Sequence, residues 1–239
     1  MLELLLAASA TALATGLGVV PVFLLGREAE LLKPALLGLA GGVMAVAAIA
    51  GLLLPAWDEG EPIEVVGGLV VGVLFLLAAR SVFGHIRPAA TVASRTSTLV
   101  FFVLLVHSLP EGFAIGTAYA SDTEGLALFV ALAIAIQNIP EGTSVAIPMA
   151  AAGHGAAHQF RAAVETSLPQ PVGAGVAYLL VEQISALLPI SFGFAAGAML
   201  ALVVIEVAPS ALRDGPRRAV AGAAVGAAVM LALSSALGV

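Results

Sequence analysis

The sequence has 239 residues, of which 61% are hydrophobic and only 10% are charged, and its formal net charge is −6. A water-soluble domain carries roughly a quarter of its residues as charged side chains, so this composition, with a mean hydropathy of +1.11, excludes an ordinary soluble fold. There is no cysteine, which excludes disulfides and thiolate or iron–sulfur sites, and no basic stretch or aromatic platform suggests a nucleic-acid partner.

Long apolar runs between polar breaks predict eight transmembrane helices. The first run carries the acid Glu3 where a signal peptide carries positive charge, so we predict a retained helix. Continuous runs favour helices over membrane strands, which alternate apolar with polar residues. They predict one all-α polytopic membrane domain over residues 1–239, surrounded by lipid. The predicted spans are 2–25, 34–54, 63–79, 98–119, 125–149, 162–181, 186–212 and 219–239.

The charged residues separate between alternate loops of this topology. Acidic residues such as Asp58, Asp122 and Glu182 fall in the loops where no Lys or Arg occurs. By the positive-inside rule the basic loops are cytoplasmic, and an even number of spans then places both termini outside the cytoplasm. We predict a multi-pass protein of the cell (inner) membrane. The basic residues, all on the cytoplasmic side, are Arg27, Lys33, Arg80, Arg87, Arg95, Arg161, Arg213, Arg217 and Arg218.

Two predicted spans resemble one another although they cross the membrane in opposite directions. Residues 38–44 read GLAGGVM and residues 193–199 read GFAAGAM. Such a pair is typical of the inverted repeat of secondary transporters, which here would relate helices 1–3 to helices 6–8 around helices 4 and 5. The open alternative is that Gly- and Ala-rich membrane helices resemble one another because small residues allow close packing.

A repeated hexapeptide places ionisable side chains near mid-membrane, where such groups indicate function. The two copies are His107-Ser108-Leu109-Pro110-Glu111-Gly112 and Gln137-Asn138-Ile139-Pro140-Glu141-Gly142. His107 and Glu111 are four residues apart and share a helix face, and Gln137 and Glu141 repeat that spacing. If the two faces meet, one imidazole, one amide and two carboxylates converge.

This set of side chains predicts a metal site. Two ionised glutamates are prohibitive in lipid, but a divalent cation cancels both charges. Imidazole with carboxylates suits zinc, iron(II), manganese or cadmium, whereas copper(I) has no soft ligand here beyond methionine. A single such histidine or glutamate would more simply be a hydrogen-bonded packing contact. Two motifs matched at their Pro and Gly positions favour the metal site instead.

The paired HSLPEG and QNIPEG motifs closely resemble those of the ZIP (ZRT/IRT-like) metal transporters, particularly the short prokaryotic members. The resemblance covers essentially the whole chain and includes the GLAGGVM and GFAAGAM segments. It implies a binuclear metal centre whose primary site is formed by His107, Glu111, Gln137 and Glu141. It also implies a transport domain that slides or rocks against a scaffold.

Several positions depart from that family's pattern. The second metal site of the family draws on the second motif positions and on a glutamate in span six, which here correspond to Ser108, Asn138 and Gln170. None of these is a carboxylate, so we predict one strong site and a second that is weak or occupied by water or a side-chain amide. Glu206, toward the inner end of span seven, is predicted to lie on the exit path; an acid snorkelling toward a basic loop is the open alternative.

The predicted function is transport of divalent transition-metal ions into the cytoplasm by alternating access, with Zn2+ as the first candidate substrate and Cd2+, Fe2+ or Mn2+ as alternatives. One alternative is an intramembrane metal-dependent enzyme that uses the same ligands. The chain has no HExxH pair and no further general base beside the site, so it is predicted not to be an enzyme. The other alternative is a proton or monovalent-cation exchanger, against which His107 argues, since sodium prefers oxygen ligands. Metal selectivity, driving force and oligomeric state, a homodimer included, are left open.

Overall fold

The computed structural model describes the backbone of residues 1–83 and 92–239, and the side chains of residues 1–26, 28–82 and 104–239. Every regular element in these ranges is helical, which confirms the all-α prediction. Arg87 lies outside the described residues. The elements are α1 (Leu2–Gly16), α2 (Val19–Leu25), η1 (Gly26–Glu28), α3 (Ala29–Ala48), η2 (Ile49–Leu53), α4 (Leu54–Glu59), α5 (Pro62–Phe83), α6 (Val92–Ala120), α7 (Leu126–Ala151), α8 (Ala156–Thr166), α9 (Pro169–Gln183), η3 (Ser185–Leu187), α10 (Leu188–Leu202), η4 (Val203–Val207), α11 (Ala208–Asp214) and α12 (Pro216–Leu237).

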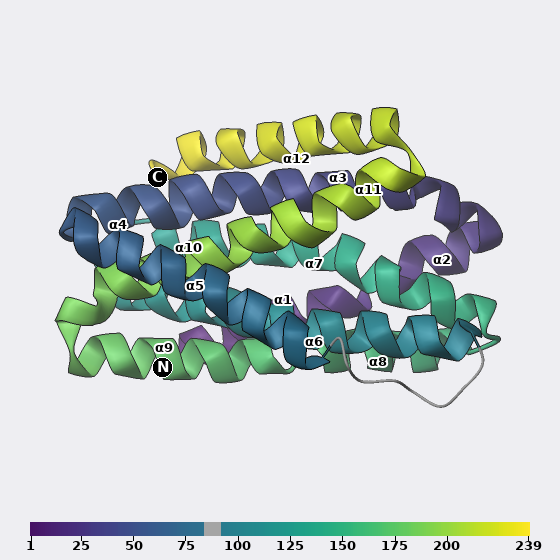
Figure 1. Cartoon of the computed structure of the whole chain (residues 1–239), viewed down its shortest axis with the longest axis horizontal. Coiled ribbons are helices and arrows are strands. Elements are labelled where there is room, and N and C mark those ends of the chain that lie inside the picture. The colour runs from purple at the N-terminus through teal and green to yellow at the C-terminus, as the bar shows by residue number, and fades with distance from the viewer. Residues whose placement is uncertain (84–91) are drawn as a thin grey trace.

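The long helices lie lengthwise in one bundle (Figure 1). Helix α3 packs on α12 and on α7, α5 packs on α10, and α6 packs on α9 and α7. Both chain termini lie at the end of the bundle where α4 joins α5, and α2 lies at the opposite end (Figure 1). The two motif helices, α6 and α7, are therefore flanked by helices from both halves of the chain.

Six helical stretches in the described part of the chain are long and apolar enough to cross a membrane. They coincide with the predicted spans 2–25, 34–54, 63–79, 125–149, 186–212 and 219–239 to within a few residues at each end. The other two predicted spans correspond to α6, which is 29 residues long, and to α8 followed by α9.

Several predicted spans are interrupted rather than continuous. The first breaks between α1 and α2 beside Gly18, where α1 packs against α7. The sixth breaks between α8 and α9, because Pro169 and Pro171 supply no backbone N–H to continue the α8 hydrogen bonds. The second and seventh each contain a π-helical turn, η2 and η4, of the kind that is frequent at functional sites.

Small residues bring the helices of each pair into close contact. A side chain at Gly38 or Gly42 of α3 would overlap a backbone carbonyl of α12, and one at Gly222 or Gly226 of α12 would overlap a carbonyl of α3. The same reciprocal contact joins α5 and α10. There the glycines that face a partner carbonyl are Gly68 and Gly72 on α5 and Gly193 and Gly197 on α10. These are the close approaches that small residues permit in membrane helices.

Adjacent glycines on α5 provide a matched test of this packing. We expect Gly68→Ala to destabilise the protein by about 1–3 kcal/mol, because the added methyl group overlaps the Ile190 carbonyl oxygen. Gly67 has no atom within 4 Å of an added Cβ, so Gly67→Ala should stabilise the helix by up to about 1 kcal/mol. Thermal unfolding in detergent measures both variants, and equal melting temperatures would contradict the packing described here.

Candidate functional site

The two motifs lie on α6 and α7, which remain helical through Pro110 and Pro140. The glycine that ends each motif allows a neighbouring helix to approach. A side chain at Gly112 would overlap the backbone carbonyl of Gln170 on α9, and a side chain at Gly142 would overlap that of Thr15 on α1. The motif glycines thus bring α9 and α1 directly against the polar faces of α6 and α7.

Glu111 is the centre of the polar cluster. Its side chain is fully buried, and its two carboxylate oxygens each accept one amide hydrogen bond. Gln137 Nε2 donates to Oε1 at 2.7 Å, and Gln170 Nε2 donates to Oε2 at 2.6 Å. Three helices, α6, α7 and α9, therefore converge on one carboxylate.

Glu141 lies beside this cluster on α7 and is 6% exposed. Its carboxyl group lies close enough to that of Glu111 for the two to interact electrostatically. Two ionised carboxylates in contact repel each other strongly in a buried site unless a proton or a cation lies between them. The pair is therefore a place where the fold itself favours positive charge.

His107 is held differently from the other motif residues. Its Nε2 atom lies 3.2 Å from Glu206 Oε2 on η4, and Arg80 Nε on α5 lies 3.7 Å from Glu206 Oε1. Glu206 therefore joins a motif histidine to a basic residue at the end of α5. The first motif position is connected through η4 toward the end of the bundle where the basic loops lie.

The three residues predicted for a second metal site, Ser108, Asn138 and Gln170, are separated by the structure into two groups. Asn138 and Gln170 are both fully buried and lie in contact, with Asn138 Nδ2 3.2 Å from Gln170 Oε1. The hydroxyl of Ser108 instead donates to the Leu104 carbonyl of its own helix at 3.0 Å. At the predicted second site, the side chains of Asn138 and Gln170 therefore offer amide groups rather than the carboxylates that a second cation would need.

One polar contact of this cluster was not predicted from the sequence. Thr11 on α1 is 2% exposed, and its hydroxyl lies 2.9 Å from Gln170 Oε1, while its carbonyl accepts from Asn138 Nδ2 at 2.7 Å. The signal available in the sequence was the spacing of Thr11 and Thr15, which places two hydroxyls on one face of an otherwise apolar helix.

The structure thus assembles Glu111, Gln137 and Glu141 and holds His107 on Glu206. Among the side chains that are described, no three His, Asp or Glu residues converge closely enough to hold a metal ion. Coordination by the complete predicted set therefore requires the His107 imidazole to leave Glu206 and turn toward the two motif glutamates.

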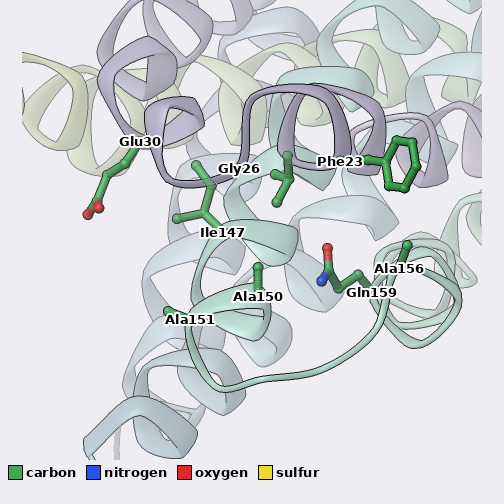
Figure 2. Close-up of a pocket in the computed structure, with 9 residues that line it drawn as sticks. Phe23, Gly26, Glu30, Ile147, Ala150, Ala151, Ala156 and Gln159 are labelled. Atoms are coloured by element: carbon green, nitrogen blue, oxygen red, sulfur yellow. The ribbon is translucent and has the colours of Figure 1, made fainter.

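Two of the cavities lie at opposite ends of the bundle, away from the motifs. One, of about 680 Å3, lies between α2, the end of α7 and the start of α8. Figure 2 shows Phe23, Ala150 and Gln159 around it, with Glu30 at its edge. The other, of about 520 Å3, lies at the end of the bundle where α4 meets α5. Its acidic lining residues are Glu59, Glu64, Asp122 and Glu182.

Comparison with known proteins places this arrangement in a family. The family model described as ZIP zinc transporter matches residues 84–234, which include both motifs and Gln170. The chain belongs to the ZIP family. This membership confirms the resemblance carried by HSLPEG and QNIPEG. Together with the apolar helices it makes the chain a membrane protein of a metal-transporter family and not an enzyme.

Individual ZIP relatives resemble the chain over most of its length. Zinc transporter GufA of Myxococcus xanthus is 32% identical over 94% of this chain and 95% of its own length. Zinc transporter ZIPB of Bordetella bronchiseptica is 34% identical over 94% of this chain and 78% of its own length. A longer Arabidopsis thaliana protein is 34% identical over 95% of this chain, which spans only 37% of that protein.

Proposed function

We propose that this chain transports Zn2+ across the membrane into the cytoplasm, through a site formed by His107, Glu111, Gln137 and Glu141. The observation that carries the proposal is the burial of two carboxyl groups, those of Glu111 and Glu141, on two adjacent motif helices that Gln137 joins by its hydrogen bond to Glu111. A divalent cation neutralises both groups at once. The names of the relatives GufA and ZIPB make zinc the first candidate for that cation.

The donor set around the two glutamates supports binding of such an ion. Gln137 Oε1 is buried and has no hydrogen-bond partner among the described residues, and an unsatisfied buried carbonyl oxygen is a costly feature that a cation relieves. The His107 imidazole is a good zinc ligand once it is released from Glu206. The exchange of His107 between Glu206 and the metal gives a route from the site toward Arg80 and the cytoplasm.

The charge distribution at the two ends of the bundle supports inward transport. The acidic cavity that contains Glu59, Asp122 and Glu182 combines residues from three loops that the sequence predicts to be extracytoplasmic. Clustered carboxylates raise the local concentration of cations. The opposite end carries Lys33, paired with Asp214 at 3.3 Å, and Arg218, which donates to the Leu31 carbonyl. By the positive-inside rule that end faces the cytoplasm.

The same considerations support eight spans in a single domain with both termini outside. Helix α6 is long enough to cross a bilayer, and α8 with α9 covers the remaining predicted span. Both termini lie toward the same end of the bundle, the end that carries the acidic cavity residues of α4 and α5 (Figure 1). An even number of crossings accounts for this placement.

An inverted repeat is supported by contacts that recur between the two halves of the chain. Gly142 faces the Thr15 carbonyl of α1 as Gly112 faces the Gln170 carbonyl of α9. The α3–α12 and α5–α10 pairs are joined by corresponding glycines, and η2 follows Met44 closely, as η4 follows Met199. Close packing of small residues alone does not require two π-helical turns at matching positions.

Packing also supports two bodies that move against each other. Helices α1, α6, α7 and α9 contact one another around the polar cluster, while α3, α5, α10 and α12 form the glycine-lined pairs. Glu206 lies on η4, which continues α10 of the second group, and His107 lies in the first group, so their contact crosses the boundary. Sliding or rocking of the motif helices would break this contact and free His107 for the metal.

The proposed function is tested by zinc influx into sealed proteoliposomes that contain a zinc-sensitive dye. We expect vesicles containing the native chain to fill with zinc, and vesicles without protein to stay dark. Parallel assays with cadmium, iron(II) and manganese define the substrate range. Failure of native vesicles to take up any of these ions under several imposed pH gradients would overturn the proposal. Sodium-driven cation movement that is indifferent to loss of His107 would favour the exchanger instead.

A further inference from the structure

Glu111 lies between two glutamine side chains that donate to it in the same way. Gln137 Nε2 and Gln170 Nε2 each lie less than 3 Å from one carboxylate oxygen, at 2.7 and 2.6 Å. Both glutamines are fully buried. An ionised carboxylate can accept hydrogen bonds but cannot donate them. These contacts therefore orient the NH2 end of both amides toward Glu111.

The opposite ends of the two amides differ. Gln137 Oε1 has no hydrogen-bond partner among the described residues. Gln170 Oε1 lies 2.9 Å from the Thr11 hydroxyl and 3.2 Å from Asn138 Nδ2. Gln137 is thus held at one end only, whereas Gln170 is held at both ends.

This difference determines which of the two side-chain amides can rotate so that its oxygen and nitrogen exchange places. Rotation of Gln137 gives up only the hydrogen bond of its Nε2 to Glu111 and presents Oε1 to a cation. Rotation of Gln170 would direct its NH2 group at the NH2 group of Asn138, which itself is fixed by a 2.7 Å hydrogen bond to the Thr11 carbonyl. The Thr11 hydroxyl also reaches the Ala8 carbonyl at 2.8 Å, so its one proton serves two acceptors, of which Gln170 Oε1 is one.

We propose that Thr11 is a positioning residue of the metal site, which together with Asn138 locks the Gln170 amide as a permanent hydrogen-bond donor to Glu111. The locked NH2 group occupies the place where a second cation would bind. It also holds the Glu111 carboxylate in an orientation that suits a single divalent ion. This inference rests on the proposed metal transport. It adds α1 to the helices that determine how the ion is held.

The test compares three single substitutions of buried threonines. Thr11→Val removes the hydroxyl at nearly constant volume, and Thr11→Ser keeps it. Thr166→Val is the matched control, since Thr166 is also buried and its hydroxyl donates only to the Ala163 carbonyl of its own helix. Zinc dissociation constants are measured by titration of the purified protein in detergent, with thermal unfolding of each variant alongside.

We expect Thr11→Val to weaken zinc binding about tenfold, the effect typical of losing an outer partner of a metal ligand. Thr11→Ser and Thr166→Val should bind zinc as the native chain does. In a Gln170→Ala background Thr11→Val should have no further effect on zinc affinity, because Thr11 acts through Gln170.

Unchanged zinc affinity in a folded Thr11→Val variant would overturn the inference, and so would independent, multiplicative effects of Thr11→Val and Gln170→Ala. An equal loss of affinity in Thr166→Val would show a general packing effect and would also overturn it. In each of these cases the native chain still binds zinc and the proposed function stands. Absence of zinc binding by the native chain would overturn both.

Discussion

Zinc influx into proteoliposomes should fall by at least about tenfold when either Glu141 or His107 is replaced by alanine. Loss of an outer-sphere partner of a metal ligand alone typically weakens metal affinity by about 10- to 100-fold, and loss of a direct ligand should cost no less. Glu141→Ala removes one of the two buried motif carboxylates, and with it half of the negative charge that they offer to a divalent ion. His107→Ala removes the imidazole and leaves Glu206 paired with Arg80 only.

A glutamate elsewhere on the membrane helices provides the control. Glu165 on α8 is paired with Arg161 at 2.7 Å, and both side chains are substantially exposed. Exposed ion pairs of this kind contribute little to stability, so Glu165→Ala should transport zinc at the native rate. Initial rates of dye response are compared at equal amounts of reconstituted protein. Native influx by both site variants would show that the zinc pathway lies elsewhere in the chain.

Gln170→Glu should raise the number of tightly bound zinc ions from about one to about two per chain. The substitution conserves shape but replaces the NH2 group that donates to Glu111 Oε2 with a carboxylate oxygen. Two carboxylates would then lie within about 3 Å of each other beside Glu141, and such buried like charges are stable only with a cation between them. A second divalent ion supplies that charge.

The matched control adds the same charge to the same helix outside the cluster. Gln183 lies exposed at the last residue of α9, so Gln183→Glu should leave the zinc content unchanged. Metal content after equilibrium dialysis, measured by elemental analysis, gives the number of ions per chain. A folded Gln170→Glu variant with native zinc content would show that carboxylate charge at this position does not govern the number of ions bound.

The sequence predicted the transmembrane architecture from local features. The apolar runs located the six spans found in the described residues, because the length of an apolar helix and its exclusion of charge are properties of a short window. The family also followed from local features, since HSLPEG and QNIPEG carry it within six residues each. The predictions of metal ligation by His107, Glu111, Gln137 and Glu141 stay predictions.

The breaks within spans were less readable. Pro169 and Pro171 mark the start of α9. Pro55 and Pro209 follow η2 and η4 by two residues each, where the missing proline N–H leaves a carbonyl of the π-helical turn without its usual helical partner. The sequence therefore carries a local signal for both turns in its two prolines, although no break was predicted at either place.

Sequence alone determined that the chain is a helical membrane protein with two matched polar motifs, because hydropathy and spacing act over a few residues. Only the tertiary structure decided how the polar groups are paired. Glu111 is held by Gln137 and Gln170, His107 by Glu206, and Thr11 enters the cluster from α1. The physical reason is that a buried polar group takes the partner that close helix packing brings within reach, and that packing joins residues far apart in the sequence.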